Sequence, residues 1–323
     1  MNNKDSKIFP DFLIASSVRN QGELDAVFLK YYNYSKTYIK TALYSYWQND
    51  RKWYEKNWPR VRTYLDKNFL SEFQKENSHN ARAWEFYLAT VFIDRGFKLL
   101  QKTWKKGPDF CIKMTTEKNI WIDAVACDDG EIHVKQYQHG CHQYGIEEMQ
   151  HNRVLRITGA LWKKFKKFND DLNDSKSEVK ISNKDCLVVA ISGANIQDKS
   201  DGQALFERAM FARGLDAYYK TPGHEGFQRG YSPAPPVTRF KKGNDSVEEI
   251  KTEPMVMDEF SKISAVLYSG YSVGHSSWSG IGDEFLFAYH SKPDNPIPEK
   301  FFNFGLGIRK NSISGEITGQ KQM

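Results

Sequence analysis

The sequence predicts an α/β protein with a central mixed sheet, a helical extension before it and extra strands after it. Three observations carry this prediction. Apolar residues recur at helical spacing in the first part of the chain, helix-like and strand-like segments alternate as αβββαβ in the middle, and two more apolar runs of strand length follow. With 323 residues, 40% of them hydrophobic, the chain can bury a sizeable core.

Residues 1–78 are predicted to form an N-terminal helical region. Residues 23–76 are rich in aromatic and basic side chains, contain no glycine and have one proline. Leu24, Val27, Phe28 and Tyr31 recur at helical spacing, so we expect two or three helices there. The polar residues 77–80 break the pattern and offer a cap for the next helix.

Residues 79–312 are predicted to hold the core and its C-terminal sheet extension. The expected elements are a helix over 81–94, strands over 97–100, 109–114 and 120–127, a helix over 147–168 and a strand over 186–191. The last strand is apolar throughout, which predicts a buried strand with a parallel neighbour.

Two further strands are expected over 263–268 and 285–290. Residues 220–254 are rich in proline, glycine and charge and include Pro233-Ala234-Pro235-Pro236, which predicts a long irregular loop that is functional or mobile. Residues 313–323 are expected to form a flexible tail.

Three acids suggest a divalent-cation site. Asp109 lies in Gly107-Pro108-Asp109-Phe110, Asp123 interrupts an apolar strand, and Glu85 falls at the edge of the buried face of helix 81–94. A buried carboxylate costs several kcal/mol unless it is paired or bound to metal. The alternatives are an ion pair of Glu85 with a neighbour such as Arg82, a turn role for Asp109 and a buried salt bridge for Asp123.

This arrangement of Glu, Pro-Asp and Asp on helix, strand and strand resembles the PD-(D/E)xK phosphodiesterase superfamily, which includes restriction-type nucleases. The resemblance implies a restriction-endonuclease-like αβββαβ core and a Mg²⁺ (or Mn²⁺) ion held by Glu85, Asp109 and Asp123. The superfamily has a lysine two residues after the strand acid, where this chain has Val125. Lys113, which shares a strand face with Asp109, is one replacement.

A lysine on the next helix is the other replacement. Arg156 and Lys163 lie seven residues apart and flank Ala160, and Arg153 falls near the same stripe. We favour Lys163 over Lys113 as the catalytic lysine, with Arg156 and Arg153 contacting substrate phosphate. The alternative is a solvated basic face, common on surface helices.

Residues 104–168 are also similar to an uncharacterised bacterial branch of the superfamily. Their common pattern is a Pro-Asp-Phe strand, a Trp-Ile-acid-Ala-Val strand and an Arg-Ile-Thr-x-Ala-Leu-x-Lys helix. With matches at residues 190–194 and 263–267, the resemblance covers about the last three quarters of the chain. It implies a fold and a metal site but no particular substrate.

Two functional hypotheses follow. The first is a metal-dependent nuclease that hydrolyses DNA or RNA, and homodimers are common among such nucleases. The second is a catalytically inactive module of the same fold, which Val125 favours. The net charge of +6 is compatible with a nucleic-acid partner. The chain has four irregularly spaced cysteines, no leader-like start and no membrane-length apolar run, so we expect a cytoplasmic protein without a membrane partner.

Overall fold

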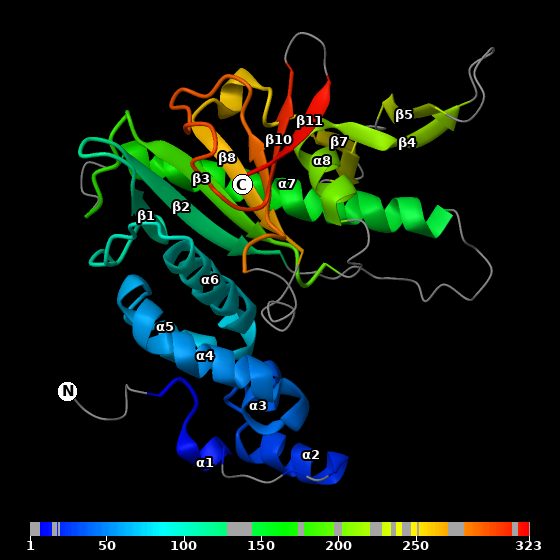
Figure 1. The fold of residues 1–323 in the computed structure, drawn as a ribbon. Helices are drawn as coiled ribbons and strands as arrows, with labels where there is room; N and C mark the ends of the chain where they lie inside the picture. Colours follow the sequence, from blue (N-terminus) through cyan, green and yellow to red (C-terminus); the bar gives the residue numbers. More distant parts are fainter. Residues whose placement is uncertain are drawn as a thin grey trace. The chain divides into compact units, whose positions relative to one another are not determined.

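The computed structural model describes residues 7–14, 18, 20–127, 144–173, 178–196, 202–219, 228–233, 237–240, 247–250, 252–270, 281–311 and 316–322. The protein is α/β, as predicted, with a mixed seven-stranded sheet in the order β1-β2-β3-β8-β9-β10-β11 (Figure 1). The chain divides into two compact units. Unit 1 comprises residues 1–126, 171–185 and 271–284, and unit 2 comprises residues 127–170, 186–270 and 285–323.

The N-terminal region of unit 1 is helical, which confirms the prediction, although it has more helices than expected. These are α1 (Asp11–Ile14), α2 (Gln21–Lys30), α3 (Lys36–Leu43), α4 (Gln48–Val61) and α5 (Phe69–Phe73). The side chains of Asn20 and Ser35 cap α2 and α3 by accepting backbone N–H groups. A buried aromatic cluster holds the helices together; its rings belong to Phe9, Tyr38, Tyr54, Phe73 and Phe86.

Helix α6 (Glu76–Asp94) begins five residues before its predicted start. The polar residues 77–80, expected to break the pattern, lie inside it. His79 among them is buried, with Nδ1 2.6 Å from the carbonyl oxygen of Phe73. Packing against α5 and the aromatic cluster therefore extends the helix through residues that would otherwise favour a cap.

The strand expected over 97–100 is wrong, because only Leu99 forms an isolated bridge, to Ile112. Strands β1 (Phe110–Lys113) and β2 (Asn119–Ala126) are present and pair antiparallel with Phe110 opposite Ile122. The described chain thus follows α6 with one strand fewer than the predicted αβββαβ order.

Unit 2 holds most of α7 (Tyr144–Asn173), together with α8 (Gly202–Phe211) and a run of buried strands. Strand β3 (Cys186–Ser192) is parallel to β8 (Ile263–Ser269), which confirms the expected parallel neighbour. Strand β9 (Leu286–Tyr289) is antiparallel to β8, and β10 (Leu306–Lys310) is parallel to β9.

Two irregular segments of the prediction are wrong. The expected tail contains β11 (Ile317–Lys321), which pairs antiparallel with β10. The expected loop 220–254 contains β5 (Gln228–Pro233), paired with β4 (Arg213–Tyr219), and β6 (Val237–Phe240), paired with β7 (Val247–Ile250). Pro233, the first residue of the proline-rich run, is the last residue of β5, a position that proline tolerates; residues 234–236 are outside the described part.

No helix in the described ranges combines the length and the apolar character that crossing a membrane requires.

Candidate functional site

Three carboxylates of unit 1 converge on one place: Asp66, Glu85 and Asp109 each offer an oxygen, and these atoms lie within 4.8 Å of one another. Asp66 lies in the turn before α5, where its carbonyl oxygen accepts the N–H of Phe69 at 2.9 Å. Glu85 is a buried residue of α6, and Asp109 directly precedes β1. We call these residues the acidic cluster. The sequence predicted two of its members.

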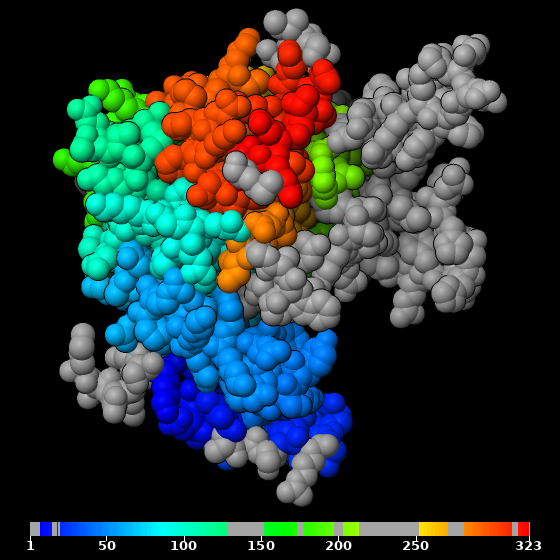
Figure 2. Space-filling view, in the orientation of Figure 1, coloured from blue at the N-terminus to red at the C-terminus, as the bar shows by residue number. Residues whose placement is uncertain are grey.

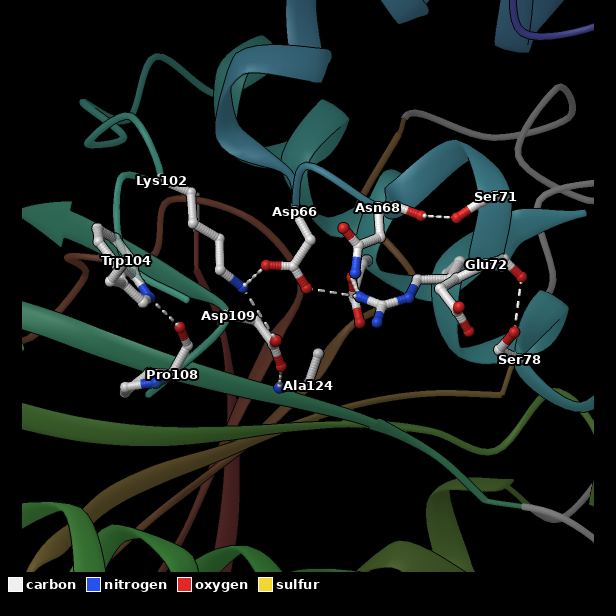
Figure 3. Close-up of polar contacts among 12 residues, drawn as sticks. Asp66, Asn68, Ser71, Glu72, Ser78, Lys102, Trp104, Pro108, Asp109 and Ala124 are labelled. Carbon is white, nitrogen blue, oxygen red and sulfur yellow. Dashed lines mark hydrogen bonds and ion pairs between the residues drawn. The ribbon is translucent and has the colours of Figure 1, made fainter. Parts of the chain in front are cut away.

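The segment that directly precedes β1 holds the side chain of Asp109 in position. Gly107 has φ +125°, and a Cβ there would lie 3.1 Å from Cγ2 of Val179. The indole N–H of Trp104 donates to the carbonyl oxygen of Pro108 at 2.7 Å, and Oδ2 of Asp109 accepts the backbone N–H of Ala124 at 2.8 Å (Figure 3). The carboxylate is therefore tied to β2 through one oxygen, which directs the other toward the cluster.

Two cations lie among these acids. The ammonium of Lys102 is 2.8 Å from Asp66 and 3.4 Å from Asp109, and its side chain is only 5% exposed (Figure 3). The guanidinium of Arg82 is 2.9 Å from Asp66 and 2.6 Å from Glu85. Three carboxyl groups thus share two positive charges.

This arrangement disfavours the ionised form of Glu85. Burial, and then the neighbouring Asp109 carboxylate, raise the pKa of Glu85 to about 8, although Arg82 and Lys102 act in the opposite direction. The Glu85 carboxyl therefore holds its proton to a higher pH than an exposed glutamate does, and added positive charge would favour its ionised form. A divalent cation is one source of that charge.

Asp123, the third predicted ligand, lies outside the acidic cluster. It is fully buried in β2. The oxygen atoms that converge within 4.8 Å belong to Asp66, Glu85 and Asp109, and the Asp123 carboxylate is not part of this group. The structure therefore brings Glu85 and Asp109 together with Asp66 rather than with Asp123.

The predicted basic residues lie on other elements. Lys113 is exposed at the end of β1 in unit 1. On α7, in unit 2, Arg153 is buried and Arg156 and Lys163 are exposed. The buried face of that helix consists of Ile157, Leu161, Phe165 and Phe168. Phosphate contact by Arg153 and Arg156, and catalysis by Lys113 or Lys163, stay predictions.

Sequence reasoning missed Asp66 and Lys102. Asp66 stands in Leu65-Asp66-Lys67-Asn68, which is typical of a turn before a helix. Lys102 resembles Lys105 and Lys106, its exposed neighbours. No local sequence pattern distinguishes either residue. They become part of the site only because the fold brings residue 66 beside residue 109.

No known family model matches the chain, and no curated protein or solved structure is similar to it.

Proposed function

We propose that this protein is a metal-dependent phosphodiesterase that hydrolyses nucleic acid, with Mg²⁺ or Mn²⁺ held by Asp66, Glu85 and Asp109. The observation that carries the proposal is the convergence of these carboxylates, within 4.8 Å, beside the buried ammonium of Lys102. The motif resemblance to the PD-(D/E)xK superfamily points to the same reaction.

The donor set fits a hard cation. Mg²⁺ and Mn²⁺ prefer carboxylate oxygens, and three carboxyl groups from separate segments can supply them. The raised pKa of Glu85 supports the fit, because a bound divalent ion would favour its ionised form. Arg82 orients two of the three ligands, since its guanidinium bonds both Asp66 and Glu85.

When bound, the ion would lower the pKa of a coordinated water and neutralise charge on the phosphate. Lys102 is the residue placed to assist, because its ammonium lies among the proposed ligands and is shielded from solvent. We assign it the role that the superfamily gives to its strand lysine, holding the attacking water or a phosphate oxygen.

A second candidate function is a non-catalytic binding module. One observation favours it: Arg82 and Lys102 already bond all three acids, so the cluster can hold itself together as an ion-pair network. In this alternative the acids stabilise unit 1, and the chain binds a partner without cleaving it.

The two functions separate in a cleavage assay on labelled single- and double-stranded DNA and RNA, with Mg²⁺ or Mn²⁺. We expect cleavage by the wild type, none by Asp109→Asn, and a rate lower by roughly 10²-fold in Lys102→Met. Asp109→Asn is suitable because an amide oxygen can still accept the N–H of Ala124. Asp283→Asn, which alters an acid paired with Arg95 away from the cluster, is the matched control and should cleave normally.

Asp123→Asn tests the original choice of ligands. Cleavage that persists in Asp123→Asn but not in Asp109→Asn would support the acidic cluster as the metal site. Activity that survives Asp109→Asn would overturn it. Absence of cleavage of every substrate, together with no heat of Mg²⁺ or Mn²⁺ binding in calorimetry, would favour the binding module.

A further inference from the structure

Exposed aromatic and basic side chains gather around α3, in the N-terminal part of unit 1. Four large hydrophobic residues that precede Trp47 are exposed: Tyr32 is 79% and Tyr46 88% exposed, and Phe12 and Leu29 are the others. Tyr32 lies four residues before α3 and Tyr46 three residues after it. The space-filling view shows the N-terminal helical region, in blue, at the molecular surface (Figure 2).

The exposed side of α3, whose sequence lies between the two tyrosines, is basic. Lys36 and Lys40 are four residues apart and so lie on one face, where Lys36 is exposed and Lys40 half-buried. None of the ion pairs formed by the described residues includes Lys30, Lys36 or Lys40.

Negative charge is scarce in this stretch of the chain. Between Asp25 and Asp50 the chain has no acidic residue. Glu76 reaches the start of α3, but its carboxylate accepts the backbone N–H of Lys36 at 2.7 Å. The face therefore attracts an anionic chain.

The apolar side of α3 is not available to a partner. Tyr38, Ile39 and Ala42 point inward and are buried, and Tyr38 stacks on Phe9. The residues that flank α3 outside include two tyrosines with polar hydroxyls, separated along the chain by a helix about 12 Å long that carries ammonium groups. A membrane or a docking helix needs a continuous apolar face, which this side lacks.

We propose that this face, formed by Tyr32, Lys36, Lys40 and Tyr46, binds single-stranded nucleic acid. The tyrosine rings stack on unpaired bases, and the two lysines contact the intervening phosphates. Unpaired bases are required because a duplex keeps the faces of its bases covered. The inference rests on the proposed function for its nucleic-acid substrate and deepens it by naming the strand form, but its residues are separate from the acidic cluster.

The test is binding of fluorescein-labelled oligothymidine, about 15 nucleotides long, to the full chain in EDTA, followed by fluorescence anisotropy. We expect tighter binding of this strand than of a duplex of equal length. Tyr32→Ala/Tyr46→Ala should weaken binding by at least about tenfold, whereas Tyr32→Phe/Tyr46→Phe, which keeps both rings, should bind like the wild type.

The contribution of the two lysines is tested by the salt dependence of binding. Lys36→Gln/Lys40→Gln should reduce the slope of log Kd against log salt by about 1.4, because each phosphate contact on a single strand contributes about 0.7. Lys180→Gln/Lys292→Gln removes the same charge at exposed positions elsewhere and should leave the slope unchanged. Unaltered melting temperatures would show that all variants fold.

Equal affinity of the Tyr→Ala variant and the wild type would overturn the inference, and so would the absence of single-strand binding. Either result leaves the proposed function standing if metal-dependent cleavage is observed. Conversely, Asp109→Asn should bind the strand normally without cleaving it. If the wild type cleaves no substrate but binds the single strand as expected, the nuclease proposal is refuted and the strand-binding inference stands.

Discussion

At the scale of single residues, the ionisation of Glu85 links stability to pH. Its ordinary pKa is 4.5, and burial together with Asp109 raises this to about 8 in the folded protein. The folded state therefore holds the Glu85 proton more tightly than the unfolded state does. The resulting stability is complete below pH 4.5 and is lost as the pH rises through about 8.

Glu85→Gln should remove this pH dependence, because the amide resembles the protonated carboxyl at every pH. In urea unfolding from pH 5 to pH 9, we expect the variant and the wild type to be similar at the acidic end. At the alkaline end the variant should be more stable by up to a few kcal/mol, since one pKa unit corresponds to about 1.4 kcal/mol. Parallel stability curves for the two proteins would contradict the raised pKa.

At the scale of elements, the short approach to β1 determines where Asp109 points. Gly107 adopts φ +125°, which favours glycine, and lies against Val179. The hydrogen bond from the indole N–H of Trp104 to the carbonyl oxygen of Pro108 also holds this turn. The position of one carboxylate of the acidic cluster thus depends on backbone geometry two residues away.

Gly107→Ala should cost about 1–3 kcal/mol of unfolding free energy, from backbone strain and the close approach to Val179, and should also weaken metal binding. Gly96→Ala is the matched control: Gly96 has φ +81° but nothing lies within 4 Å of its added Cβ. It should cost only about 1 kcal/mol, the backbone part. Urea unfolding measures both. Equal losses would show that the contact with Val179 contributes nothing.

The elements also show how far sequence reasoning extends. Strands β3 and β8 were predictable because every residue in them is apolar or small and both are buried on two faces. The start of α6 was not, since the buried contacts of His79 override local preference. Strand β11 has an exposed, polar sequence, and pairing with β10 rather than hydrophobicity defines it.

The residues of the candidate site also divide into those that the local sequence indicates and those that only the fold brings together. Glu85 and Asp109 could be chosen from their surroundings in sequence, where an acid interrupts or borders an apolar segment. Asp66 and Lys102 could not, because their roles come from contacts with residues far along the chain.

At the scale of the whole molecule, the two units are interleaved along the chain. Unit 1 is assembled from residues 1–126, 171–185 and 271–284, and unit 2 from the segments between and after them. Unit 1 needs its later segments: Asp185 accepts the N–H of Asn119 and the indole N–H of Trp121, and Glu284 accepts the hydroxyl of Tyr87. Because the segments of the two units alternate along the chain, neither unit can fold completely until a segment of the other has been passed.

This interleaving predicts that the units unfold together. We expect one calorimetric transition whose van't Hoff enthalpy equals the measured enthalpy, although the molecule has two compact units. Residues 1–126 expressed alone should lack a cooperative transition, because Trp121 and Tyr87 lose their partners and part of the aromatic interior is left open. Two resolved transitions in the full chain, or a cooperatively folded fragment, would show that the N-terminal segment carries its own stability. In that case the acidic cluster, whose members all precede residue 110, could be studied in isolation.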